Sequence, residues 1–406
     1  MSINPEQGGV CAPQGFVAAG LRCGIAKKKD KKDLALIYSK AVCSAAAVYT
    51  QNRVKAAPVT VTQTNLSDGR AHAVICNSGN ANACTPDGEA VAQRMCAIAA
   101  KTLNIGHRDV VVASTGVIGQ SLDPAPIEKA MNTLASALSD KGSADALAAI
   151  MTTDLRPKEI AVSFVLDGKT CKMGAIAKGS GMIHPNMATM LAFITTDAAI
   201  AAPMLQQALS TVVPDTFNMV SVDGDTSTND MTALLANGLA GNALIETPGD
   251  SYDIFVRALT HICIYLARAI ARDGEGATRL IECSVAGAKD DTSAKLLAKS
   301  VICSSLFKAA VFGKDANWGR VLCALGYSGA EFDTAGVKVQ FASKAGKLTV
   351  CENGVHFPFS EDLASRVLGE EEIEILVGLG DGGGSAVAWG CDLTYDYVKI
   401  NGDYRS

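Results

Sequence analysis

Short apolar runs that read as buried strands alternate along this chain with longer stretches of helical periodicity. Strand-like runs occupy 34–38, 73–76 and 110–113. Apolar residues recur at helical spacing over 255–270, and this stripe closes at Arg272-Asp-Gly274, a sequence typical of a helix end. The alternation predicts an α/β or α+β fold.

Further signals refine this class. Asp123 and Pro124 mark the start of another helix, and a third candidate helix covers about 294–310. Period-two patterns at 160–164, 337–341 and 373–377 predict more strands. Hairpin-type turns are indicated by Asp167-Gly168 and Asn353-Gly354. Several hairpins among the helices predict mixed sheets, stacked in layers.

Composition excludes some classes of function. The 406 residues are 48% hydrophobic and only 5% aromatic, so the core consists mainly of Ala, Val, Ile and Leu. A formal net charge of -5 gives no basic excess, and we therefore expect neither nucleic acid nor an anionic membrane as a partner. No uninterrupted apolar run approaches the roughly 18–20 residues that span a bilayer.

The thirteen cysteines do not form a recognisable metal or redox motif. They are scattered from Cys11 to Cys391, their number is odd, and no C-x-x-C occurs. We expect free thiols, mostly buried as small apolar groups. The first residues lack a secretory signal pattern, so a reducing cytoplasm is the expected location.

Four polar or glycine-rich segments invite a functional interpretation. Residues 77–83 are expected to form a loop, and the lysine cluster within 27–33 a solvated hairpin tip. Gly378–Gly383 fits G-x-G-x-x-G, but a strand rather than a helix follows, which favours a tight turn over a dinucleotide site. Asp223–Asp230 lacks the glutamate of a calcium loop, so we expect a polar loop near the pocket.

The chain offers no conventional hydrolase nucleophile. None of its five histidines accompanies a G-x-S-x-G motif. A cut before a Thr would place a free α-amine, with a pKa of about 7.7–8.0, on the same residue as the hydroxyl. Thr189 suits this role because small Ala188 precedes it and a strained turn, with Gly179-Ser-Gly181 and His184-Pro-Asn, lies just upstream.

The segment Lys178–Leu191 (KGSGMIHPNMATML) resembles the cleavage segment of the ornithine acetyltransferase family, also called glutamate N-acetyltransferases. Further matches follow in order along nearly the whole chain: AAAVYTQNRVKAAP at 45–58, NSGNANA at 77–83, ASTGVIG at 113–119, MTTD at 151–154, DGEGA at 273–277, DANWGR at 315–320 and KINGDYRS at 399–406.

The resemblance implies the layered, mixed-sheet α/β fold of the self-cleaving ornithine acetyltransferase type. It also implies a cut between Ala188 and Thr189, giving an α chain of 1–188 and a β chain of 189–406 that stay together, two such pairs forming an α2β2 heterotetramer. The activity implied is transfer of an acetyl group from N2-acetylornithine to glutamate in arginine biosynthesis, by a ping-pong route through an ester on Thr189.

Roles for individual residues are likewise implied by the resemblance. Thr189 would be the nucleophile and its amine the base, while the Thr115 hydroxyl and the Gly116 N–H would stabilise the oxyanion. Substrate contacts are implied for the following residues: Thr152, Lys178, Thr189, Glu275, Asn401 and Ser406. Lys178 suits the α-carboxylate that both substrates carry, and Glu275 suits the side-chain ammonium of N-acetylornithine. His184 is assigned to the turn before the cut rather than to acid–base chemistry.

Several alternatives stay open. Acetyl-CoA is an alternative acetyl donor, and no sequence signature decides whether it is used; we expect no metal and no prosthetic group. A related self-processing amidase or aminopeptidase would pass the acyl group to water instead of glutamate. A non-catalytic metabolite-binding protein is the third reading, and it predicts an uncleaved chain.

Overall fold

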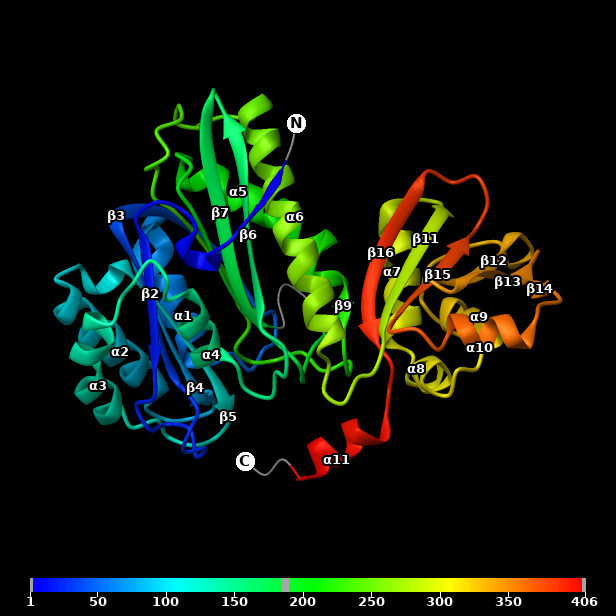
Figure 1. Cartoon of the computed structure of the whole chain (residues 1–406), viewed down its shortest axis with the longest axis horizontal. Helices are drawn as coiled ribbons and strands as arrows, with labels where there is room; N and C mark the ends of the chain where they lie inside the picture. Colours follow the sequence, from blue (N-terminus) through cyan, green and yellow to red (C-terminus); the bar gives the residue numbers. More distant parts are fainter. Residues whose placement is uncertain (1–2, 185–189, 404–406) are drawn as a thin grey trace.

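The computed structural model describes residues 3–184 and 190–403, which form two mixed β-sheets with helices packed on them (Figure 1). The first sheet has nine strands in the order β1-β6-β7-β8-β10-β3-β4-β5, with β2 also paired to β3. Its strands are β1 Asn4–Glu6, β2 Phe16–Leu21, β3 Leu34–Tyr49, β4 Arg70–Asn80, β5 Val110–Val117, β6 Lys158–Leu166, β7 Lys169–Lys178, β8 Leu191–Thr196 and β10 Met231–Ala236.

The second sheet has seven strands in the order β14-β13-β12-β15-β11-β16-β9. They are β9 Val220–Ser221, β11 Leu280–Ala288, β12 Lys338–Ser343, β13 Gly346–Glu352, β14 Val355–His356, β15 Glu372–Gly378 and β16 Gly384–Cys391. Parallel and antiparallel pairs occur in both sheets: β4–β5 and β8–β10 are parallel in the first, β11–β15 and β9–β16 in the second. The mixed-sheet expectation is therefore confirmed.

The helices are α1 Ala57–Asn65, α2 Gly88–Leu103, α3 Ala125–Ser136, α4 Ser143–Ile150, α5 Ala202–Val212, α6 Asp250–Arg272, α7 Asp291–Cys303, α8 Ser305–Phe312, α9 Trp318–Gly326, α10 Glu361–Val367 and α11 Tyr395–Asp403. Alternating residues of the first sheet divide between two faces. Helix α4 packs on one face, whereas α1, α2, α3, α5 and α6 supply apolar side chains to the other. Helices α7 and α10 pack on the second sheet.

Helix α6 joins the two sheets into one core. It contacts β6 and β7 of the first sheet and β9, β11 and β16 of the second, and Figure 1 shows it running between them. In the described part of the chain it alone is long and apolar enough to cross a membrane by length and composition, with a mean hydropathy of 1.6. Its apolar stripe, including Phe255, Leu259, Ile262 and Leu266, is fully buried, as expected of a core helix.

Two strands extend further than the sequence suggested. We expected residues 77–83 to be a loop, but β4 continues to Asn80; likewise β5 runs through Ser114, Thr115 and Gly116 to Val117. The reason is that Gly79 and Gly116, at φ of 113° and 131°, allow two irregular backbones to remain paired with each other. As a result, the two expected oxyanion donors, Thr115 and Gly116, lie on a paired strand and not in a turn.

Other expectations can be compared directly. The expected helix over 294–310 is two helices, because the Ser304 side chain caps α8 by accepting a bond from Phe307 N. Helix α3 begins at Ala125, one residue later than predicted. The turns at Asp167-Gly168 and Asn353-Gly354 join paired strands as predicted. Gly378–Gly383 connects β15 to β16, which confirms a turn between strands.

Candidate active site

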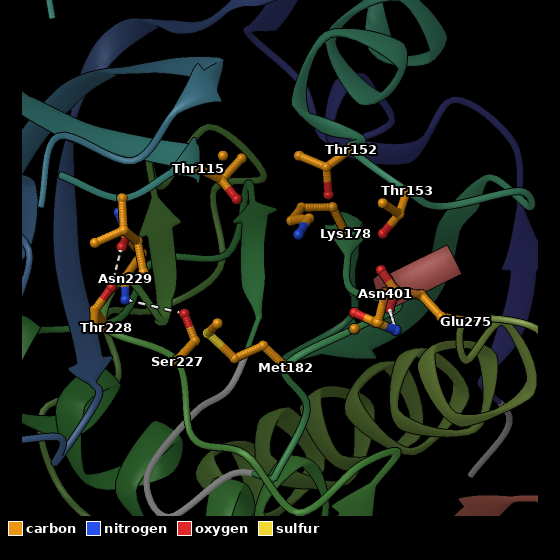
Figure 2. A pocket seen from close by; sticks show the side chains of 13 residues that line it. Thr115, Thr152, Thr153, Lys178, Met182, Ser227, Thr228, Asn229, Glu275 and Asn401 are labelled. Carbon is orange, nitrogen blue, oxygen red and sulfur yellow. Dashed lines mark hydrogen bonds between the residues drawn. The ribbon is translucent and has the colours of Figure 1, made fainter. Parts of the chain in front are cut away.

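A small polar cavity of about 160 Å³ opens where β5 and β7 of the first sheet end. Its lining residues are Thr115, Gly116, Ile118, Thr152, Thr153, Lys178, Gly181, Met182, Ser227, Thr228, Asn229, Glu275 and Asn401. Figure 2 shows Thr115 and the Thr228–Asn229 pair on one side and Glu275 with Asn401 on the opposite side. In this view Thr152 and Lys178 lie between the two sides.

The first side combines Thr115, on strand β5, with Thr228 and Asn229, in the loop before β10. Thr115 is 9% exposed and Lys178 is 8% exposed. Gly116 must be glycine, because a Cβ there would collide with the backbone of Gly79 and Asn80 on the neighbouring strand. The Asn229 side-chain amide donates to Ala81 O at 2.6 Å and to Ser114 O at 2.8 Å, which fixes the 227–229 loop against β4 and β5.

The opposite side consists of a loop and the C-terminal helix. Asn401 on α11 donates its side-chain amide to the Glu275 carboxylate at 2.8 Å. The Glu275 N–H donates to Ser180 O at 3.1 Å. A Cβ on Gly181 would collide with the Glu275 carboxylate, so the glycine at this position allows the acid to approach the chain. The lining of the pocket thus includes a cation, Lys178, and an anion, Glu275.

A buried ion cluster lies behind the pocket. Lys158 Nζ lies 2.8 Å from Asp154 Oδ1 and 2.5 Å from Asp273 Oδ2, and all three side chains are at most 3% exposed. Burial opposes ionisation of Asp154, but the charges of Lys178 and Lys158 outweigh it and hold the pKa of that carboxyl below its usual range.

The same cluster connects the segments that carry the pocket residues. Asp154 accepts bonds from Thr152 N at 2.9 Å and Gly179 N at 2.7 Å. Asp273 accepts from Leu155 N, and its backbone carbonyl accepts from the Ser180 hydroxyl at 2.6 Å. The buried cluster therefore holds three segments of the pocket in place through hydrogen bonds. They are the segment of Thr152, the chain that follows Lys178 and the loop that carries Glu275.

Two titratable groups adjoin the region of the expected cut. Asp230 directly precedes Met231, whose N–H donates to Met190 O, and burial raises the pKa of the Asp230 carboxyl well above its usual value. Its Oδ2 is buried and has no hydrogen-bond partner among the residues that the structure describes. His184 Nδ1 lies 3.1 Å from Ser221 Oγ, and burial lowers the pKa of His184 to about 4.

The structure brings together six of the residues selected from the sequence: Thr115, Gly116, Thr152, Lys178, Glu275 and Asn401. Ala188, Thr189 and Ser406 lie outside the described residues. His184 is not among the lining residues. The polar loop expected over 223–230 does reach the pocket, through Ser227, Thr228 and Asn229.

Sequence reasoning missed several residues of the site. Thr153, Gly181 and Met182 line the pocket although no role was assigned to them, and the Lys158–Asp154–Asp273 cluster was not anticipated. Asp154 and Asp273 do lie within MTTD and DGEGA, two of the segments that carry the family resemblance. Their position there was the one sequence signal that could have identified them as residues of the site. The described ranges contain no group of three His, Cys, Asp or Glu residues arranged to hold a metal ion. All thirteen cysteines are described and free, as expected.

Comparison with known proteins gives a consistent result. The model of the ArgJ family matches residues 17–406. An arginine biosynthesis bifunctional protein ArgJ of Symbiobacterium thermophilum is 52% identical over 401 residues, covering 98% of this chain and 99% of that protein. The protein of the same name from Caldanaerobacter subterraneus subsp. tengcongensis is 50% identical, covering 97% and 98%.

A solved structure also matches. The crystal structure of an arginine biosynthesis bifunctional protein ArgJ from Bacillus halodurans has 46% sequence identity and a TM-score of 0.50. The match covers 52% of this chain and 98% of that chain, so the matched chain is about half as long as this one.

The two sheets and the helices packed on them define a layered, mixed-sheet α/β protein. More particularly, the chain belongs to the ArgJ family, because the family model and the relatives cover nearly its whole length.

Proposed function

We propose that this protein is a self-processing acetyltransferase that moves an acetyl group from N2-acetylornithine to glutamate, producing ornithine and N-acetylglutamate for arginine biosynthesis in the cytoplasm. One observation carries the proposal: a single small cavity combines Thr115 and Gly116 with Lys178 and Glu275. A small polar space whose lining includes a cation and an anion suits an amino acid with a charge at each end. The names of the relatives place them in arginine biosynthesis, which agrees with this substrate class.

In the proposed mechanism Thr189 takes the acetyl group from the donor in a first half-reaction and passes it to the acceptor in a second. The Thr189 hydroxyl adds to the acetyl carbonyl, its proton passes to the α-amine of the same residue, and the C–N bond to ornithine breaks as that proton reaches the leaving nitrogen. Glutamate then attacks the ester through its own amine. A C–N bond forms, the ester C–O bond breaks, and a proton returns to the hydroxyl.

Thr115 and Gly116 would stabilise the negative oxygen of each tetrahedral intermediate, through a hydroxyl and a backbone N–H respectively. A preset donor at such a point contributes about 10²–10³ in rate. Lys178 would bind the α-carboxylate common to both substrates, and Glu275, supported by Asn401, would bind the ammonium of N-acetylornithine. Thr152 would contact the substrate between these groups.

Self-cleavage between Ala188 and Thr189 is part of the proposal. Support comes from the matched crystal chain, which is about half the length of this chain. The fold also supports continued association of 1–188 with 189–406. Strand β8 pairs with β7 and β10 pairs with β3, so two ladders of the first sheet join the two products. We further propose that two such pairs assemble as an α2β2 heterotetramer.

Intact-mass analysis followed by N-terminal sequencing of the smaller species tests the cut. The expected result is two species, with Thr189 as the new N-terminus. Thr189→Ala should give one uncut chain without transferase activity, whereas Thr211→Ala, which removes an exposed threonine hydroxyl on α5, should be cut and active. An uncut wild-type chain with full activity would contradict the mechanism.

A transferase and a hydrolase differ in the molecule that accepts the acetyl group, which is glutamate in the first case and water in the second. With N-acetylornithine as donor, transfer requires that product formation depend on added glutamate. Acetate release at the same rate with and without glutamate would instead identify a self-processing amidase. A single uncut species with neither activity would favour a metabolite-binding protein.

A further inference from the structure

Two apolar side chains are exceptional in the lining of the small polar pocket. Among the described residues that line it, Ile118 and Met182 alone have wholly apolar side chains. Ile118 directly follows β5 and packs against a small cluster of buried alanines. Figure 2 shows the Met182 side chain extending toward Ser227, which also lines the pocket. The pocket therefore has a small apolar part beside its charged and hydroxyl groups.

Met182 has a backbone conformation that residues with a bulky side chain rarely adopt. Its φ is 56°, in the left-handed region, where the Cβ comes too close to the following carbonyl oxygen. Met182 is also 43% exposed, so burial in the core does not compensate for this strain. A strained residue of this kind persists only where the surrounding structure imposes its conformation, and such residues cluster at ligand sites.

The Asp223 carboxylate imposes the conformation of Met182. Its Oδ2 accepts a bond from the Met182 N–H at 2.7 Å, and its Oδ1 accepts one from the Ile183 N–H at 2.9 Å. On the other side of Met182, Gly181 lies against the Glu275 carboxylate so closely that a Cβ would collide with it. The backbone at Met182 is thus held from two sides, which also fixes the direction in which its side chain leaves the chain.

The acetyl group of the proposed donor needs polar and apolar contacts at the same time. Its carbonyl oxygen would be bound by Thr115 and Gly116, and its methyl group is bonded to the same carbon as that oxygen. The methyl group must therefore lie close to these donors, where an apolar contact is favourable. A neighbouring cavity of about 470 Å³ also begins at Gly116, but neither Ile118 nor Met182 lines it.

We propose that Met182, together with Ile118, forms an apolar subsite for the methyl group of the donor and limits the transferred group to acetyl. This inference rests on the proposed function and deepens it, because it names the residue that selects the acyl group. A pocket of about 160 Å³ that also holds an amino acid leaves little space for a longer acyl chain beside Met182. The chemical steps are those of the proposed mechanism and do not change.

Donors of increasing acyl length test the subsite: N2-acetylornithine, N2-propionylornithine and N2-butyrylornithine, with glutamate as acceptor. In the wild type, kcat/KM should fall by about tenfold or more with each added methylene. Met182→Ala keeps the Cβ and therefore the backbone strain, but it opens space in the pocket. We expect kcat/KM for the butyryl donor to rise by about tenfold in this variant. For the acetyl donor it should fall by about fourfold, the size expected for the lost contact of one methyl group.

The opposite directions of these two changes separate a specificity role from a structural one. Damage to the fold lowers kcat/KM for all three donors together, whereas loss of the acyl contact lowers it for acetyl and raises it for butyryl. Met182→Leu keeps a large apolar side chain and should preserve the wild-type order of the donors. Leu244→Ala shortens an exposed apolar side chain in the loop before α6, and this matched control should change none of the three values.

A second variant keeps the test independent of self-cleavage. Because Met182 lies close in sequence to the expected cut, intact-mass analysis first checks that each variant is processed. Ile118→Ala changes the other apolar side chain of the subsite, far from the cut in sequence, and should shift the donors in the same two directions. If Met182→Ala stays uncut, the result for Ile118→Ala decides.

The order of the donors and the identity of the acceptor are read separately. Equal kcat/KM for the three donors in the wild type would overturn the subsite, because the acyl chain would then extend into the larger cavity. Acetyl transfer to glutamate with an unchanged donor order in the processed alanine variants would also overturn it and leave the acetyltransferase standing. A shifted donor order seen only as release of the free acid into water would support the subsite and contradict the proposed function. A wild type that acts on none of the donors would overturn both.

Discussion

The two sides of the candidate active site are held in place by different means. Thr115, Gly116 and Lys178 lie on paired strands, so hydrogen-bond register fixes their positions, and Thr115 and Lys178 are also buried. Glu275 and Asn401 lie on a loop and on α11, a helix with no buried residue, and a side-chain bond of 2.8 Å joins them. Figure 1 shows α11 extending away from both sheets toward the C-terminus.

This difference follows from what each side is proposed to do. Oxyanion stabilisation needs donors that do not reorganise during the reaction, and strand residues provide them. Substrate selection must accept an ammonium in one half-reaction and a carboxylate in the other, and a partly buried side chain on a loop, such as Glu275, can adjust to both. We therefore expect mutations of the oxyanion donors on the strand side to alter kcat, and mutations on the loop side to alter KM for one substrate.

The largest effect should come from the cluster that joins the two sides. Lys158→Met leaves Asp154 and Asp273 buried without their partner, and removal of one partner of a buried ion pair costs about 3–5 kcal/mol. Chemical denaturation measures this cost. The control is Lys308→Met, which also removes a buried lysine, but one that donates to the Val222 carbonyl and leaves no carboxylate unpaired. Equal losses in the two variants would show that the cluster has no special role.

The cluster also makes a prediction about pH. The pKa of Asp154 lies below its ordinary value, so the folded chain binds fewer protons than the unfolded chain in that range. Its stabilising contribution is complete above the pKa of about 3.9 of an unfolded aspartate and is lost as the pH falls further. The acid unfolding curve of Lys158→Met should therefore be shallower than that of the wild type.

The strand side should show the next largest effect. Thr115→Val keeps the shape of the side chain and removes the hydroxyl, and loss of one oxyanion donor lowers kcat by about 10²–10³, or about 3–4 kcal/mol. Thr115→Ser retains the hydroxyl and should recover most of the rate. Steady-state kinetics with both substrates checks this, and a change confined to KM would assign Thr115 to substrate binding instead.

Much of the strand side was predictable from sequence, but its geometry was not. The patterns around 73–76 and 110–113 gave strands that the structure contains, and the resemblance selected Thr115 and Gly116. The predicted ends of these two strands were wrong at Gly79 and Gly116. Glycines usually end a strand, but here the two glycines pair with each other on neighbouring strands. Such a pairing depends on a partner more than thirty residues away, and the local strand propensity of a segment carries no information about that partner.

The loop side and the buried cluster were harder to predict. Glu275 and Asn401 came from the resemblance alone, because neither belongs to a periodic pattern. Lys158 opens a strand that was recognised by its apolar period at 160–164, and a lysine at that position is usually exposed. Its burial depends on Asp273, 115 residues away, so only the three-dimensional contact shows why the charge is retained.

A smaller effect, limited to one substrate, is expected at Glu275. Glu275→Gln removes the charge and keeps the shape, so KM for N-acetylornithine should rise by about tenfold to a hundredfold, as for a lost hydrogen bond to a charged group of about 1.5–3 kcal/mol. KM for glutamate should not rise, because glutamate has no ammonium at that end. Glu246→Gln, at an exposed acid in the loop before α6, should leave both KM values unchanged. An equal rise for both substrates would contradict the assignment.

The smallest effect should come from Asn401, because it acts on the substrate through Glu275. Asn401→Ala removes one hydrogen bond at an exposed site, worth about 0.5–1.5 kcal/mol, so KM for N-acetylornithine should rise only severalfold. Lys399→Ala, on the same helix, controls for damage to α11. In the double variant with Glu275→Gln the two losses should not add, since Asn401 would then have no carboxylate to orient. Additive losses would mean that Asn401 contacts the substrate directly, and the loop side would then have two independent anchors rather than one supported acid.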